Sequence, residues 1–173
     1  VFDSGGVELT AYAADNVTSA DDFATDLAAS SGSSLVGFLQ SGSGADASTV
    51  QTKLREWVSV KDFGAVGDGT TDDTAAFVAA LAAHDFVYVP PVVGSSYRIT
   101  STITITGTKT LAGPDGGSQA FQHTAIYHDP SATGELFNVT SSEQQGVCIR
   151  NMRILGGNGT WAIKSSRSYC RYE

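Results

Sequence analysis

Short runs of β-forming residues, separated from one another by turn residues, fill the second half of the chain. Apolar side chains occupy alternate positions where these runs are longest, as in Val147 and Ile149 and again in Met152 and Ile154. This pattern predicts a solenoid of short strands in which each turn buries one face. Asn151, at the bend between the two runs, either bonds the backbone of neighbouring turns or is a solvated turn residue. The runs occupy residues 87–89, 97–99, 103–105, 125–127, 136–139, 147–155 and 161–163.

Composition excludes several other classes of protein. The formal net charge is -8 and the ten Lys and Arg residues are dispersed, which argues against nucleic acid as a ligand. No apolar run approaches the ~20 residues that span a bilayer, so we expect no membrane insertion. Cys148 and Cys170 are too few for a disulfide framework and have no metal-ligand spacing to a histidine, so we expect free thiols and no cofactor.

The first 48 residues are mostly small and polar. They contain one short helical pattern at residues 19–29, in which Phe23 and Leu27 lie one turn apart, and a Ser/Gly run at 30–34 ends it. An apolar cluster of Leu35, Val36, Phe38 and Leu39 follows, and a flexible Gly/Ser/Ala stretch comes after it at 41–48. An apolar cluster between two loops needs a partner surface.

Residues 49–58 have the pattern of an amphipathic helix. Val50, Leu54, Trp57 and Val58 form one apolar stripe, and charged residues occupy the other side. Burial of four side chains stabilises such a helix by less than the ordering of its ten residues costs, so it is not stable alone. The stripe packs either on the domain that follows or on its own copies around a threefold axis. We favour the threefold axis.

The segment 58–76 carries the most specific motif of the chain. Gly64, Gly67 and Gly69 permit a tight loop with positive φ angles, and Thr71 or Asp72 then caps a helix that continues to residue 81. This helix has a narrow apolar face suited to covering the open end of a sheet, which blocks edge pairing. The residues of the opening motif are Asp62, Phe63, Gly64, Gly67, Asp68, Gly69, Asp72 and Asp73.

Two kinds of polar cluster could instead carry chemistry. Asp68, Asp72 and Asp73 are compatible with calcium ligands or with paired catalytic carboxylates. Turn formation and capping account for all three without a ligand, and the spacing of an EF-hand is absent. His123 and His128 are separated by an odd number of residues that places them on opposite faces of a strand. We therefore predict no metal site and no catalytic residue in the chain.

The segment 58–76 resembles the opening of the pectate-lyase-like β-helix domains of bacteriophage tailspikes, and residues 32–40 resemble their neck region. The resemblance covers about residues 30–110, and residues 1–29 match nothing that we can name. It implies a mainly β fold with short helices, in which a helical and loop anchor leads into a right-handed parallel β-helix. The expected domains are a virion-attachment and linker region at 1–48, a neck helix at 49–60, and a capping helix with the first coils at 61–173.

The resemblance also implies a function and partners. It implies a homotrimer on the virion, made in the bacterial host cytoplasm, whose neck is formed by Val50, Leu54, Trp57 and Val58. The cluster 35–39 is our candidate contact with phage tail or baseplate proteins. Tailspikes of this kind recognise capsule or lipopolysaccharide, and many are depolymerases that cleave it on coils that we expect after residue 173. Asp129 is assigned as a surface acid.

Two other functions are compatible with the sequence. A non-catalytic tail fibre, adhesin or fibre-branching adaptor would need the same neck and the same opening of the β-helix. A cellular pectate-lyase-like enzyme is a weaker alternative, because it would not need the neck. The chain begins with Val and stops after a strand-like stretch, so we expect a piece of a longer protein.

Overall fold

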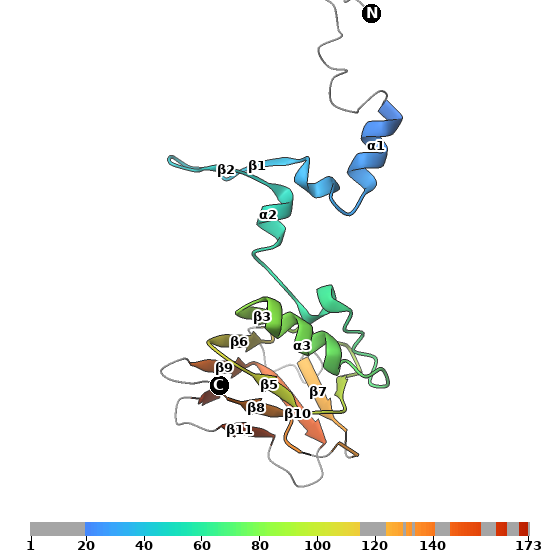
Figure 1. The fold of residues 1–173 in the computed structure, drawn as a ribbon, viewed down its shortest axis with the longest axis vertical. Coiled ribbons are helices and arrows are strands. Elements are labelled where there is room, and N and C mark those ends of the chain that lie inside the picture. The colour runs from blue at the N-terminus through green and yellow to red at the C-terminus, as the bar shows by residue number, and fades with distance from the viewer. Residues whose placement is uncertain are drawn as a thin grey trace, which may run out of the picture. The chain divides into compact units, whose positions relative to one another are not determined.

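The computed structural model describes residues 20–114, 124–129, 131–132, 134–140, 146–156, 162–165 and 170–172. The chain divides into two compact units, Val1–Glu56 and Trp57–Glu173 (Figure 1). The predictions for residues 1–19 and for His123 lie outside the described residues. None of the described helices is long and apolar enough to cross a membrane.

The first unit is built from short helices and one hairpin. Strands β1 and β2 pair antiparallel, with Phe38 opposite Ser48. Helix α1 lies where the sequence predicts a helix, and α2 begins after Thr49, whose side chain accepts a hydrogen bond from the backbone N–H of Thr52. The elements are α1 (Ala20–Ala28), the 3-10 helix η2 (Gly32–Ser34), β1 (Gly37–Leu39), β2 (Ala47–Thr49) and α2 (Val50–Leu54).

Helix α2 is shorter than the pattern of residues 49–58 predicts, because it ends at Leu54. The backbone of Val58 lies beside a strand of the second unit instead, where its carbonyl accepts a hydrogen bond of 2.8 Å from the N–H of Tyr88. Backbone groups in a strand ladder cannot also form helical bonds. The apolar stripe is therefore split between the two units.

The second unit is mainly β with few helices. A 3-10 helix, η3 (Val60–Phe63), and a helix, α3 (Thr74–Ala83), precede the strands. The strands are β3 (Phe86–Tyr88), β4 (Tyr97–Ile99), β5 (Ile103–Ile105), β6 (Lys109–Ala112), β7 (Thr124–His128), β8 (Phe137–Val139), β9 (Val147–Arg150), β10 (Met152–Gly156), β11 (Ile163–Ser165) and β12 (Cys170–Tyr172). Each predicted run of β-forming residues overlaps a strand, although the run 161–163 does so only at Ile163, and β6 and β12 are additional.

The described strands of this unit form three parallel sheets in a repeating order. One sheet has the order β12-β9-β6-β3, the second β10-β7-β4, and the third β11-β8-β5. Each set of three consecutive strands therefore contributes one strand to every sheet, which fits the β-helix expected from the sequence. The bend between β9 and β10 is at Asn151, whose φ of 59° is the left-handed conformation that Asn tolerates better than most residues.

The core lies between the sheets and is made of side chains stacked from turn to turn. Val87 is in register with Leu111, and Leu111 with Ile149, so one apolar row runs through the first sheet. Phe137 is in register with Ile103 in another sheet. All of these side chains are buried and belong to one apolar cluster. The alternation predicted from the sequence thus gives each sheet an inward apolar face.

Candidate functional site

The opening motif lies along the free edges of the first strands of the second unit. Beside β3, Tyr88 N–H donates to the Val58 carbonyl, and Ser59 forms an isolated parallel bridge with Tyr88. Beside β4, Gly69 N–H donates to the Ser96 carbonyl at 2.9 Å. Unpaired strand edges invite pairing with other chains, so these bonds close two of them.

The start of α3 continues this arrangement along β4 and the residues that follow it, and the helix covers β5. The N–H of Asp73 donates to the Arg98 carbonyl at 2.9 Å. The N–H of Thr100 donates to the Thr74 hydroxyl at 3.0 Å, and α3 contacts β5. Residues 58–83 thus bond or cover the first strand of each parallel sheet, as a preceding turn would.

Asp73 holds the glycine loop of this motif against the helix start. Its carboxylate accepts hydrogen bonds from the N–H groups of Val66 at 2.7 Å and Gly67 at 3.1 Å, and the residue is only 2% exposed. Gly67 has a φ of +73°, and a Cβ there would lie 2.7 Å from Val92 Cγ1 and 2.9 Å from Tyr97 Cε1. Only glycine fits this position without displacement of its neighbours.

The other acids of the motif are also committed to hydrogen bonds. Asp62 accepts from Ser59 N–H at 2.8 Å, and Asp68 accepts from the N–H groups of Thr70 and Thr71 at 2.8 and 2.7 Å. The bonds from Thr71 and Thr70 hold the pKa of Asp68 well below its usual range. Such turns need no ligand, which favours the structural interpretation of these carboxylates.

Asp72 joins the motif to the end of β4. Its carboxylate accepts from the hydroxyls of Thr100 at 2.6 Å and Thr74 at 2.5 Å. Partial burial acts to raise the pKa of Asp72, but the bonds from Thr100 and Thr74 outweigh it and lower the pKa. Among the described residues, no group of three His, Cys, Asp or Glu side chains is placed to hold a metal ion.

The prediction that Asp129 is an ordinary surface acid is wrong. Its carboxylate accepts a hydrogen bond of 2.8 Å from Arg98 Nε, and Arg98 also donates to the Thr70 carbonyl at 3.0 Å. Hydrogen bonds from Ser131, and then that from Arg98, lower the pKa of Asp129 to about 2. The pair therefore links two turns of the second unit to the opening motif.

Two further residues considered in the sequence analysis, Phe63 and His128, are partly and fully buried, respectively. Phe63 is partly buried against the core, and its ring meets that of His84 edge to face at 6.1 Å. His128 is 2% exposed, and its Nε2 is buried without a hydrogen-bond partner in the described structure.

The apolar side chains predicted to contact the virion are on the surface of the first unit. Leu35, Val36 and Leu39 are 57%, 43% and 65% exposed, and Phe38 is half-buried. Among residues 22–56, the only buried residue is Gly32. This unit therefore has helices and a hairpin but no apolar core of its own.

The four residues predicted to form a neck do not make one stripe. In the first unit, Val50 is half-buried and Leu54 is 65% exposed. In the second unit, Val58 is buried, whereas Trp57 is 70% exposed and meets Phe86 edge to face at 5.9 Å. Leu54 and Trp57 are thus the neck candidates whose surfaces are free in the single chain.

The sequence of the second unit matches a known protein family. A sequence model of the rhamnogalacturonase A/epimerase, pectate lyase-like family matches residues 57–164. The chain belongs to this family. The pectate lyase-like match begins at the first residue of the second unit and covers most of its strands.

Relatives of the pectate lyase-like chain include phage structural proteins. It is 36% identical to the pre-neck appendage protein of a Bacillus phage over 114 residues, 60% of this chain and 13% of that protein. It is 43% identical to the tail spike protein of an Escherichia phage over 70 residues, 40% of this chain and 8% of that protein. The chain thus corresponds to a small part of these relatives.

A solved structure shares the fold. Tailspike protein 3 of bacteriophage CBA120 superposes with a TM-score of 0.70 at 22% identity, over 88% of this chain and 26% of that one. The resemblance to pectate-lyase-like domains of phage tailspikes, stated from the segment 58–76, is confirmed by these comparisons. The parallel sheets together with this likeness fit a β-helix.

Proposed function

We propose that this chain is the virion-proximal part of a homotrimeric phage tailspike and that it leads into a right-handed parallel β-helix. The observation that carries the proposal is the contrast between the two units. The second has a stacked apolar core, whereas residues 22–56 bury no apolar side chain. A unit without a core needs a partner surface to be stable.

Two surfaces of the first unit have separate roles in this proposal. Leu54, on α2, contacts its copies around the threefold axis. The hairpin and the residues before it, with Leu35, Val36 and Leu39 exposed, contact a tail or baseplate protein of the virion. The names of the relatives support this location, since one is a pre-neck appendage protein and another a tail spike protein.

The opening motif acts as the N-terminal cap of the β-helix. Its bonds to the edges of β3 and β4, and the packing of α3 near β5, support this role. The cap prevents strand pairing at that end of the solenoid and fixes where winding begins.

The complete protein recognises capsule or lipopolysaccharide of the host bacterium and degrades it. We expect no catalytic group in this part, and the structural hydrogen bonds accepted by Asp62, Asp68, Asp72, Asp73 and Asp129 support that expectation. We assign sugar binding and cleavage to coils beyond residue 173. The structural role of these carboxylates is equally compatible with the alternative function, a non-catalytic fibre or adhesin with the same cap.

Two measurements on the full-length protein test the proposal. Light scattering gives the number of copies, and incubation with host capsule or lipopolysaccharide gives the release of reducing ends or unsaturated sugars. We expect a trimer that releases sugar. If the protein is a trimer and binds the host bacterium but releases no sugar from any of its surface polysaccharides, the fibre or adhesin is supported. A monomer contradicts the neck.

A further inference from the structure

The three sheets of the second unit present different outward faces. In the sheet β11-β8-β5, Thr104 and Asn138 are in register and Lys164 continues the row, so the face is polar. In the sheet β10-β7-β4, one outward row contains Arg98, Tyr127 and Leu155 in register, and Arg153 is in register with Ala125. The first of these faces is thus polar, and the second mixes charged side chains with one aromatic and one aliphatic side chain.

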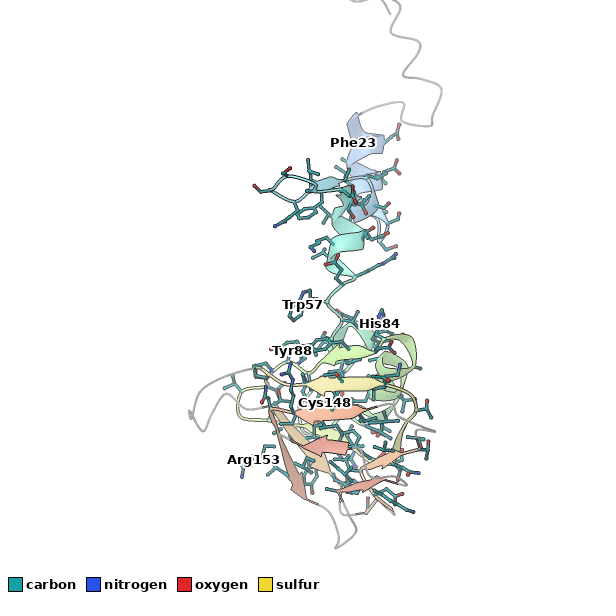
Figure 2. The ribbon with its side chains drawn as sticks, turned by 90° about the vertical axis from the view of Figure 1, so that its left-hand side faces the viewer. Phe23, Trp57, His84, Tyr88, Cys148 and Arg153 are labelled. Carbon is teal, nitrogen blue, oxygen red and sulfur yellow. The ribbon has the colours of Figure 1, made fainter. Side chains whose placement is uncertain are left out.

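The outward face of the sheet β12-β9-β6-β3 is different. Phe86 is in register with Thr110, and Thr110 with Cys148, while Tyr88 is in register with Ala112. The outward positions of β3, β6 and β9 therefore contain aromatic or small side chains, apart from Arg150 at one end, and the row ends at Arg171 of β12, which is in register with Cys148. Figure 2 is seen from the side of this sheet, with Tyr88 and Cys148 labelled along it.

Trp57 extends this face beyond the edge of β3. Its ring is 70% exposed although it meets the Phe86 ring at 5.9 Å, and Phe86 is itself 36% exposed. Two adjacent aromatic rings left in water mark a contact surface more often than single scattered apolar residues do. We name Trp57, Phe86, Tyr88, Thr110 and Cys148 the aromatic face.

The charge of the aromatic face suits a second copy of the same chain. The chain carries a formal charge of -8, so an interface between copies has to avoid apposed acids. The outward positions of β3, β6 and β9 contain no Asp or Glu. At the rim, Asp85 is paired with Lys109 at 2.9 Å, which leaves that pair neutral.

The covalent link to the neck indicates that a second copy of the chain covers the aromatic face. Trp57 follows Leu54 by three residues, and a chain extends by at most ~3.6 Å per residue, so the two lie within about 11 Å of each other. If Leu54 meets its copies around a threefold axis, Trp57 of each copy has to lie near that axis too. Trp57, which begins the aromatic face, is therefore the residue of that face that lies nearest in sequence to the proposed neck contact at Leu54.

We propose that the copies of the pectate lyase-like unit meet through the aromatic face, so that the trimer contact continues from the neck along β3, β6 and β9. This inference rests on the proposed trimer and adds the surface through which the second units associate. The other two sheet faces then remain in contact with solvent.

A pair of matched threonine substitutions tests the aromatic face. Thr110 and Thr104 are both outward residues of short strands, on the aromatic face and on the polar face respectively, but Thr110 is half-buried and Thr104 exposed, so the strand content of each variant has to be checked. Thr110→Glu and Thr104→Glu impose the same loss of β propensity, but only the first brings carboxylates together between copies. The mass of the whole 173-residue chain is measured by light scattering over a dilution series, and circular dichroism reports its strand content.

The expected result is at least tenfold weaker association for Thr110→Glu, with Thr104→Glu still trimeric like the unsubstituted chain. A trimeric Thr110→Glu protein with unchanged dilution behaviour overturns the aromatic face and leaves the trimer itself intact. If the unsubstituted chain is a monomer, both the trimer and this contact are wrong. If Thr110→Glu unfolds, Phe86→Ala decides, because Phe86 is 36% exposed on the aromatic face and lies outside the neck segment 49–60. Weakened association then supports the face, and unchanged association refutes it.

Discussion

Replacement of Asp73 by alanine should destabilise the second unit far more than the same replacement of Asp68. Both carboxylates accept hydrogen bonds from two backbone N–H groups of the opening motif. Asp73 is 2% exposed, whereas Asp68 is an exposed residue. The two positions therefore form a matched pair that differs in access to water.

The magnitude follows from what the lost carboxylate leaves behind. In Asp73→Ala the N–H of Gly67 loses its acceptor, and such a buried unsatisfied donor costs about 1–3 kcal/mol. The bond from the N–H of Val66, a residue 48% exposed, is only partly buried and adds about 1 kcal/mol, so the total loss is about 2–4 kcal/mol. In Asp68→Ala, water replaces the carboxylate at the N–H groups of Thr70 and Thr71, so we expect a loss of about 1 kcal/mol or less.

Urea unfolding followed by circular dichroism measures this difference. Both variants and the unsubstituted chain are compared at one protein concentration, because association shifts the apparent stability. With an m-value of about 1–3 kcal/mol/M, the midpoint of Asp73→Ala falls by roughly 1 M or more, and that of Asp68→Ala by much less. Equal midpoints for the two variants would refute the argument that burial makes the Asp73 carboxylate more important than that of Asp68 for the stability of the loop.

Further predictions concern assembly, pH and cleavage. Leu54→Asp places a charge at the proposed neck and should convert the trimer to a monomer in light scattering, while Lys53→Asp, on the charged side of α2, should not. The folded-state pKa of Asp129 is about 2, below its ordinary value of 3.8, so the hydrogen bonds that its carboxylate accepts from Ser131 and Arg98 stabilise the fold above about pH 4, and this stabilisation is lost as the pH falls toward 2. Acid unfolding of Asp129→Asn should therefore be less steep in that window, and an unchanged profile would contradict the pairing. Asp68→Asn should leave sugar release by the full-length protein intact, and loss of release with the fold preserved would mean that Asp68 has a catalytic role.

The strands were predictable from sequence wherever apolar residues alternate or cluster. Ile103 and Ile105 flank a polar residue, and the structure buries both. Strand β6 was missed because it starts with Lys109 and Thr110, which have no apolar alternation. Lys109 is nevertheless well covered, with its amine bonded to the His84 carbonyl at 3.1 Å and to Asp85. A local pattern gives no sign of such a distant partner.

The site was predictable only where its geometry is local. The tight loop of the opening motif followed from its glycines, and Gly64, Gly67 and Gly69 all have positive φ angles. The pair of Arg98 and Asp129 was not predictable, since 31 residues separate them and winding of the chain alone brings them together. The end of α2 was missed for a similar reason, because the competing bond at Val58 comes from a strand 30 residues later.

The stacking of the strands lets the turns of this solenoid differ in length without disturbing the core. Ile103 is in register with Phe137, 34 residues later, and Phe137 is in register with Ile163, only 26 residues later. Both pairs occupy the same sheet, so the difference of eight residues is absorbed entirely at the corners between strands. An insertion at a corner adds surface while every stacked row keeps its neighbours. Such a scaffold can acquire new recognition loops in evolution one corner at a time, with little cost to folding.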